Sequence, residues 1–140
     1  MVICAIVSIA GTIGISGLLG MMKRYQLKEG TVEIANQMTL ARMAAMNRNK
    51  TVTVSLSVSG GQVHLVSTDS AGAAVTADMT PMRHVTQVSG GPVTFNSLGM
   101  RTSGGATAQQ IAISTSSNQT FSVAIATSGK VFPCYKATCP

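Results

Sequence analysis

Charged residues are scarce in this sequence, and acidic residues are the scarcest of them. Only 10% of the 140 residues are charged, and four acids face ten Lys and Arg. An average soluble domain has about 25% charged residues. A surface so poor in charge lacks the repulsion that keeps soluble proteins apart. The composition therefore favours a subunit that contacts copies of itself.

Tryptophan is absent, and aromatic residues make up 4% of the chain, so a core must be built from Val, Ile, Leu and Met. No nucleophile, base and acid can be combined into a catalytic set. Asp69 and Asp78 lie in a predicted loop, where we expect them to be solvated. The paired glycines resemble turns and lack the lysine spacing of a phosphate-binding loop. The sequence predicts no enzyme activity and no cofactor.

Two of the three cysteines, Cys134 and Cys139, lie in the C-terminal tail with four residues between them. Metal sites that use paired cysteines need further ligands nearby, and neither His64 nor His84 has a ligand-like spacing. We therefore predict a disulfide that closes a short terminal loop in an oxidising compartment, with a metal site as the less favoured alternative. Cys4 lies in an apolar run and is interpreted as a small hydrophobic residue.

A long hydrophobic run occupies the N-terminus, where residues 1–22 carry no charge and Lys23 and Arg24 follow at once. A membrane-spanning helix needs about 20 mostly apolar residues. The run is longer than the apolar part of a signal peptide and has no basic segment before it, so we interpret it as a retained span. The basic pair favours a cytoplasmic flank, whereas the tail cysteines favour an external polar domain, and we give the cysteines more weight.

Glycine recurs at every third position within the second half of this run. Each glycine costs a helix about 1 kcal/mol relative to alanine. One interpretation is close contact between helices, and the sharper one is a segment that loses helical structure and stretches. The glycines concerned are Gly11, Gly14, Gly17 and Gly20.

A second helical pattern follows the basic pair and continues to about Asn49. Its apolar positions are spaced by seven, four, three and four residues, and polar residues such as Gln37 lie off this stripe. The pattern predicts an amphipathic helix over 23–50 that packs one face on a globular body formed by 51–140. The stripe consists of Leu27, Ile34, Met38, Ala41 and Ala45.

Beta patterning follows the helix, with residues 68–82 and 100–107 interpreted as loops. Short turns between consecutive strands indicate an antiparallel meander. The predicted fold class is α+β: a long N-terminal helix, its apolar half spanning a membrane or in a filament core, packed on an antiparallel β-sheet domain. The strands are predicted at 51–58, 63–67, 83–88, 93–96, 109–115, 120–126 and 131–133.

Four stretches carry a family resemblance that covers nearly the whole chain. The apolar start, residues 1–10, resembles the helix of type IV pilins just after their processing site. Residues 40–49, LARMAAMNRN, resemble the "ARxxAxxRN" signature of the GspH/FimT class of pilins and pseudopilins. Residues 93–99 resemble the mid-domain strand and turn of that class, and 122–131 resemble its closing strand and turn.

The resemblance implies a structural subunit that starts in the bacterial inner membrane and is assembled by the pilus or secretion machinery. The product would be an extracellular helical filament of copies of this chain. The family's leader peptide, first Phe and acidic residue would precede Met1, so we expect the mature chain to begin upstream or the given start to be incomplete. The helix core of the filament is expected to contain Ile3, Ile6, Ile9, Ile13, Ile15, Leu18 and Leu19.

Three other functions stay open. The chain could be a FimT-like minor pilin that binds DNA during uptake, because its net charge is +6 and Lys130 and Lys136 lie near the tail. It could instead be a minor pseudopilin of type II secretion. The third alternative is a membrane-anchored domain that never polymerises. Most basic residues are scattered, which favours an ordinary solvated surface over a nucleic-acid site.

Overall fold

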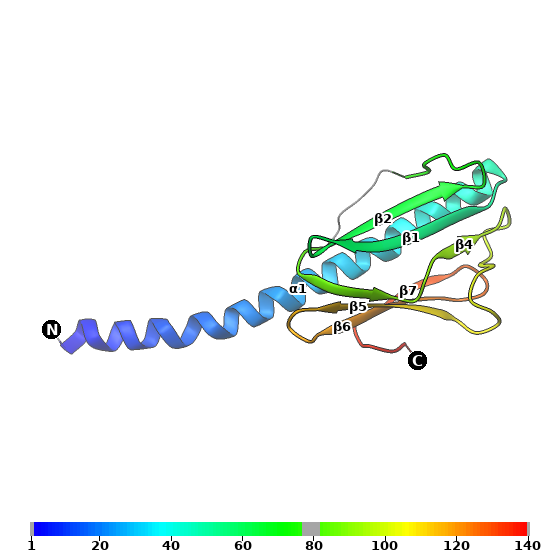
Figure 1. Cartoon of the computed structure of the whole chain (residues 1–140). Coiled ribbons are helices and arrows are strands. Elements are labelled where there is room, and N and C mark those ends of the chain that lie inside the picture. The colour runs from blue at the N-terminus through cyan, green and yellow to red at the C-terminus, as the bar shows by residue number, and fades with distance from the viewer. Residues whose placement is uncertain (1, 77–81, 140) are drawn as a thin grey trace.

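The computed structural model describes residues 2–76 and 82–139, with the backbone alone described for residues 2–19. Among these described residues, one long helix, α1, precedes seven strands. Figure 1 shows α1 reaching from Val2 into a β-domain, where its second half is covered by strands. The elements are α1 (Val2–Arg48), β1 (Val52–Ser59), β2 (Gln62–Asp69), β3 (Val85–Ser89), β4 (Val93–Phe95), β5 (Gln109–Thr115), β6 (Thr120–Ile125) and β7 (Val131–Cys134).

The strands form two antiparallel sheets, one with the order β2-β1-β4 and the other with the order β3-β5-β6-β7. Sequential pairing holds for β1 with β2, and for β5 with β6 and β7. The predicted meander is wrong for the two middle strands, because β4 pairs with β1 and β3 pairs with β5. At Gly90, φ is +119° and the backbone lies against Gln110 of β5, leaving no room for a Cβ. This turn carries the chain from one sheet to the other.

The predicted helical stripe is buried along its whole length. All five of its residues, from Leu27 to Ala45, are at most 3% exposed, and α1 contacts strands of both sheets. Gln37, predicted to lie off the stripe, is buried as well, and its side-chain amide donates a hydrogen bond to Glu33 at 3.0 Å. The second half of α1 is therefore part of the domain core.

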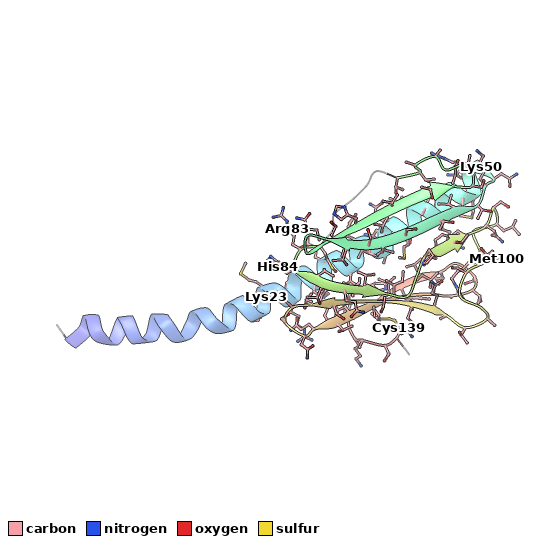
Figure 2. All side chains as sticks on the ribbon, in the orientation of Figure 1. Lys23, Lys50, Arg83, His84, Met100 and Cys139 are labelled. Carbon is pink, nitrogen blue, oxygen red and sulfur yellow. A yellow bond between two sulfur atoms is a disulfide. The ribbon has the colours of Figure 1, made fainter. Side chains whose placement is uncertain are left out.

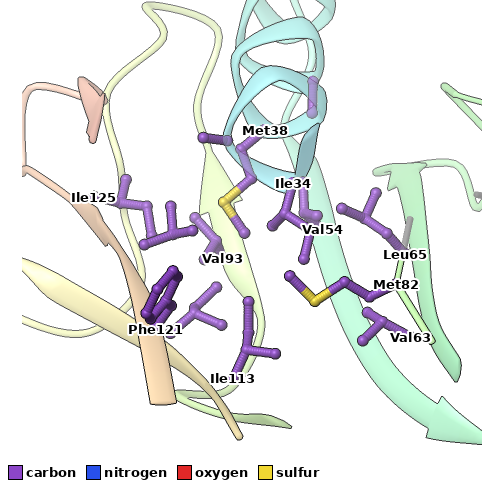
Figure 3. Close-up of a cluster of buried hydrophobic side chains, with 14 of the residues drawn as sticks. Ile34, Met38, Val54, Val63, Leu65, Met82, Val93, Ile113, Phe121 and Ile125 are labelled. Atoms are coloured by element: carbon purple, nitrogen blue, oxygen red, sulfur yellow. The ribbon is translucent and has the colours of Figure 1, made fainter. Parts of the chain in front are cut away.

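The core combines side chains from the helix and both sheets (Figure 3). Ile34 and Met38 of α1 lie among residues of β1, β2, β5 and β6 in the same cluster. Burying one such side chain contributes about 1.5–3 kcal/mol. Aliphatic residues and methionine dominate this core, as the composition predicts, and Phe95 is its largest fully buried side chain.

Asp69, predicted to be solvated, is instead buried at the end of β2. Its side chain is 4% exposed and lies 3.4 Å from the Nζ of Lys50. One carboxylate oxygen accepts hydrogen bonds from the backbone N–H groups of Ala71 and Ala73, both at 2.9 Å. Because these donors close the turn after β2, Asp69 is a structural residue. Asp78 lies outside the described residues.

The pKa of Asp69 is lowered, chiefly by the hydrogen bond from Ala73, with smaller contributions from Ala71 and Lys50, and desolvation opposes them. A carboxyl with a lowered pKa in the folded state stabilises the fold above its unfolded pKa of about 3.9. That contribution disappears as the pH falls through the folded-state pKa.

Asp69→Asn should therefore lower the thermal midpoint at neutral pH, because the turn loses its charged acceptor. The difference from the natural chain should shrink as the pH falls below about 4. Melting curves of both proteins across this range measure the effect. A difference that keeps its size down to about pH 2 would contradict the role assigned to the carboxylate.

Candidate functional site

The residues predicted to drive assembly all belong to the N-terminal part of α1. The backbone of α1 is one continuous helix from Val2 to Arg48, and its first half extends beyond the β-domain (Figure 1). In the part of the chain that the structure describes, no helix is both long and apolar enough to cross a bilayer. The side chains concerned lie outside the described ones: Ile3, Ile6, Ile9, Ile13, Ile15, Leu18 and Leu19.

The glycine series lies in the same extending half. The helix is unbroken at Gly11, Gly14, Gly17 and Gly20 in the single subunit. The predicted loss of helical structure concerns the assembled filament, and a single subunit does not test it.

The far end of the domain is organised around Arg42 of α1. Its Nε donates a hydrogen bond to the carbonyl oxygen of Gly99 at 2.9 Å. Gly99 and Gly129 occupy two different turns, with φ of +74° and +79°. A Cβ on Gly129 would collide with the carbonyl oxygen of Gly99 and lie 3.0 Å from the Nε of Arg42. We call this contact of three residues the distal junction.

The distal junction joins three of the stretches that carry the family resemblance: the end of the helix, the mid-domain turn and the closing turn. Sequence reasoning noted each stretch but missed that they meet. The signal available in the sequence was a glycine in each of the two turns, since glycine adopts a positive φ readily. The partly buried position of Arg42 is known only from the structure.

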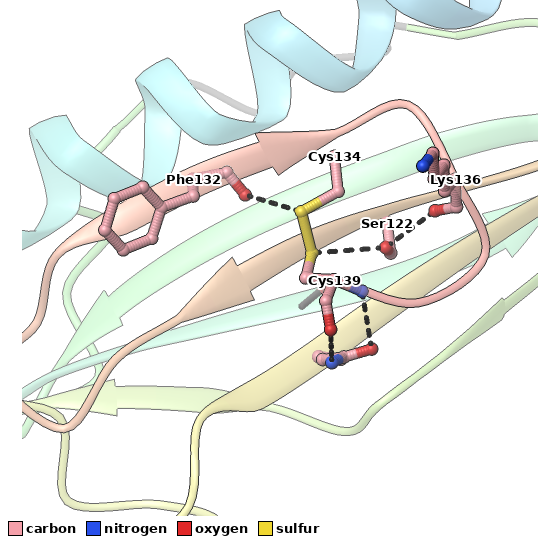
Figure 4. The surroundings of a disulfide bond; sticks show 6 residues. Ser122, Phe132, Cys134, Lys136 and Cys139 are labelled. Carbon is pink, nitrogen blue, oxygen red and sulfur yellow. Dashed lines mark hydrogen bonds between the residues drawn. A yellow bond between two sulfur atoms is a disulfide. The ribbon is translucent and has the colours of Figure 1, made fainter.

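The C-terminal tail is fixed to the second sheet (Figure 4). Cys134 and Cys139 form the predicted disulfide. The hydroxyl of Ser122 donates to the carbonyl oxygen of Lys136 at 2.8 Å, and the amide of Gln110 donates to the carbonyl oxygen of Cys139 at 3.2 Å. Closing so short a loop stabilises a fold by about 2–3 kcal/mol, which is a large contribution for a small body.

The tail loop also contacts the helix. Tyr135 meets Phe121 edge to face, with ring centroids 5.8 Å apart. The Nζ of Lys28 lies 4.9 Å from the centre of the Tyr135 ring, a cation–π distance. A groove of about 310 Å³ follows this contact, between the tail loop and the part of α1 that leaves the domain. It is lined by Met21, Arg24, Tyr25, Lys28, Phe121 and Tyr135.

The two candidate DNA contacts are not brought together. Lys130 precedes β7, and its Nζ lies 4.7 Å from the centre of the Phe132 ring. Lys136 follows β7, in the disulfide loop. At about 3.3 Å per residue, the strand separates their backbones by roughly 13 Å.

A second groove, of about 530 Å³, lies on another side of α1. Its lining includes Lys23, Glu29 and Glu33 of the helix, Arg83 and His84 before β3, and the turn between β5 and β6. Figure 2 shows Lys23, Arg83 and His84 at the end of the domain from which the helix emerges. The described residues include no group of three His, Cys, Asp or Glu that could hold a metal ion.

Residues 31–129 match the family profile of the type II transport protein GspH. This chain belongs to the GspH family. The family comprises pilin-like structural subunits, so its membership confirms the predictions of a pilin-type fold and of a protein that is not an enzyme. It also implies a location at a membrane or in a pilus-type filament, with filament or secretion machinery as partners.

The GspH-type fold is also seen in solved structures. Two crystal forms of the type IV minor pilin FimU of Pseudomonas aeruginosa are similar to this chain at 14% sequence identity. The first has a TM-score of 0.60 and covers 86% of this chain and 96% of its own. The second has a TM-score of 0.56, with 79% and 94% covered. No curated protein sequence matches this chain.

The distal junction makes a prediction about stability. Gly129→Ala should destabilise the domain by more than 1 kcal/mol, because its Cβ would collide with Gly99 in addition to the cost of a positive φ. Gly105→Ala is the matched control, since Gly105 has a φ of +74° and open space at its Cβ position. Urea denaturation measures both variants. Equal losses would show that backbone conformation alone explains the Gly129 effect.

Proposed function

We propose that this GspH-family chain is a structural subunit of a type IV pilus or pseudopilus-like filament. The observation that carries the proposal is the division of α1 into two halves. From Leu27 onward the helix buries its apolar stripe in the β-domain, whereas the uncharged run before Lys23 extends beyond the domain. A helix that is apolar on all sides is stable only in lipid or among other such helices.

A filament supplies the second of these environments. Moving the run from the bilayer into a core of similar helices exchanges one apolar medium for another at modest cost. The subunit would start in the bacterial inner membrane, be extracted by the assembly machinery, and end in an extracellular filament with copies of itself as neighbours. The β-domain would form the outer surface.

A minor pseudopilin of type II secretion is the alternative that the family description favours. Purified filaments in which this chain is the dominant band would support the major-subunit proposal over a minor subunit and over an anchored domain that never polymerises. Mass spectrometry of the native N-terminus would test processing upstream of Met1.

DNA capture is a second candidate function, and the net charge of +6 favours it. Lys130 precedes β7 and Lys136 follows it, so the two side chains would act as independent phosphate contacts. Each such contact would contribute mainly through release of counterions.

Assembly should depend on the apolar run. Ile9→Asp or Ile13→Asp should abolish filaments while the β-domain stays folded, because a charge at the centre of an apolar span costs at least about 2.5 kcal/mol. Electron microscopy of sheared filaments measures assembly, and circular dichroism checks the fold. Ile9→Leu is the matched control, since it keeps the position apolar. Filaments of normal length from either aspartate variant would contradict the proposal.

The helix should lose backbone hydrogen bonds within the glycine series once the subunit is in the filament. Four glycines forfeit roughly 3–4 kcal/mol of helix propensity relative to alanine. In lipid an unpaired backbone group costs several kcal/mol, which preserves the helix, whereas neighbouring helices and hydroxyls such as Thr12 and Ser16 can pair these groups in a filament. A filament map should show the helix broken or stretched between Gly11 and Gly20. Continuous i to i+4 hydrogen bonds from Ile3 through Ala45 would favour tight packing of an intact helix.

The DNA candidate has its own test. Replacing both Lys130 and Lys136 with alanine should weaken DNA binding and reduce its salt dependence. Each phosphate contact releases counterions when it forms, so a variant with fewer contacts releases fewer of them. Binding to duplex DNA at several salt concentrations measures both effects. Unchanged affinity, or no binding by the natural chain at low salt, would exclude this function.

A further inference from the structure

Charges at the end of the domain from which α1 emerges are ordered by their distance from the apolar run. At 1.5 Å per residue, Lys23 and Arg24 lie within about 3 Å of Met22 along the helix axis, and Lys28 lies at about 9 Å. The carboxylates of Glu29 and Glu33 come later, at about 10 and 16 Å. The helix therefore presents only cations next to its apolar end.

This order matches the layers of a bilayer. The headgroup region of one leaflet is roughly 5–8 Å thick, so a helix whose apolar run ends at the hydrocarbon boundary holds Lys23 and Arg24 inside that region. Lys28, whose Nζ lies over the Tyr135 ring, has a side chain long enough to reach that region. Both carboxylates then lie outside the layer of lipid phosphates.

The β-domain adds a further cation to the same end. Arg83 is exposed and lines the 530 Å³ groove together with Lys23, and Glu29 and Glu33 line the same groove farther along the helix. Figure 2 shows Arg83 and Lys23 at the end where the helix emerges. Within the part of the chain whose side chains are described, Lys50 and Asp69 form the sole ion pair. None of the described carboxylates, including those of Glu29 and Glu33 in the same groove, forms an ion pair with Arg83 or with the helix cations.

Tyrosines accompany these cations on the other side of the helix. Tyr25 is 64% exposed and lines the 310 Å³ groove with Tyr135, Met21 and Arg24. Tyrosine is enriched at the boundary between membrane and water, because its ring is apolar and its hydroxyl is polar. Cations and tyrosines thus surround α1 at one level.

We propose that this end of the subunit, which we call the proximal face (Lys23, Arg24, Lys28 and Arg83), binds the phosphate groups of anionic phospholipids while the subunit resides in the membrane. The inference rests on the proposed membrane location of the apolar run. Each basic side chain near an anionic surface strengthens attachment about fivefold. Arg83 matters most to the argument, because it makes the β-domain itself, beyond the helix, part of the lipid contact.

The contact has a consequence for assembly. Extraction into a filament must break the bonds between the proximal face and the lipid phosphates, so anionic lipid holds the folded domain at the membrane until extraction. It also accounts for a basic pair on the external side of the span, where the positive-inside rule does not place it.

The test uses the full chain in lipid nanodiscs of two compositions, phosphatidylcholine alone and phosphatidylcholine with phosphatidylglycerol. Amide hydrogen exchange is measured for peptides covering residues 23–30 and 82–89. With phosphatidylglycerol, exchange should slow about fivefold or more, and added salt should reverse the effect. Arg83→Gln should abolish the difference for 82–89. Arg48→Gln, which removes an exposed cation at the opposite end of α1, should leave it intact.

Three outcomes would overturn the proposal. Equal exchange in both discs would show no headgroup contact. Equal protection by inorganic phosphate added to phosphatidylcholine discs would assign the face to free phosphate. Protection that requires a second subunit in the disc would assign it to a protein neighbour. A chain that inserts but shows no lipid effect refutes only the proximal face, whereas a chain that does not enter discs refutes the membrane location as well.

Discussion

Burial of one helical stripe between two sheets is the interaction on which the whole domain depends. Each sheet packs its inner face against the second half of α1. Ile34 and Met38 therefore lie in a core to which both sheets contribute side chains. The sheets have three and four strands. They contact each other through β3, and α1 supplies apolar side chains to the core that both share. The helix that the proposed filament needs is therefore also the element that folds the β-domain.

The distal junction keeps that helix in register with the sheets. A shift by one turn would place Met38 where Ala41 packs, and a close-packed core does not accommodate that change in size. The hydrogen bond from the Nε of Arg42 to the carbonyl oxygen of Gly99 holds the helix at one position along the sheets. The close contact between Gly99 and Gly129 keeps that carbonyl group in place. At the opposite end, the tail loop adds the contact of Tyr135 with Lys28. The packed half of α1 is thus held at both ends.

The parts of this fold that follow a period could be predicted from the sequence. The stripe from Leu27 to Ala45 has spacings of seven, four, three and four residues, and β1 alternates strictly, so both elements and their buried faces are confirmed. The partners of β3 and β4 could not be predicted, because pairing depends on where a turn directs the chain. Asp69 accepts hydrogen bonds from the nearby backbone of Ala71 and Ala73, and such a turn leaves no periodic signal. The meeting of Arg42 with two glycines depends on contacts distant in sequence.

The distribution of glycine in α1 connects the two halves of the helix to their different roles. Four glycines lie in the half that extends beyond the domain, whereas the packed half contains only Gly30, which is buried. A helix loses structure where propensity is low and no tertiary contact compensates. Any opening that starts in the glycine series must stop where Leu27 enters the core, because continuing would expose the stripe that joins the sheets. The apolar half can therefore change conformation in a filament while the β-domain stays folded.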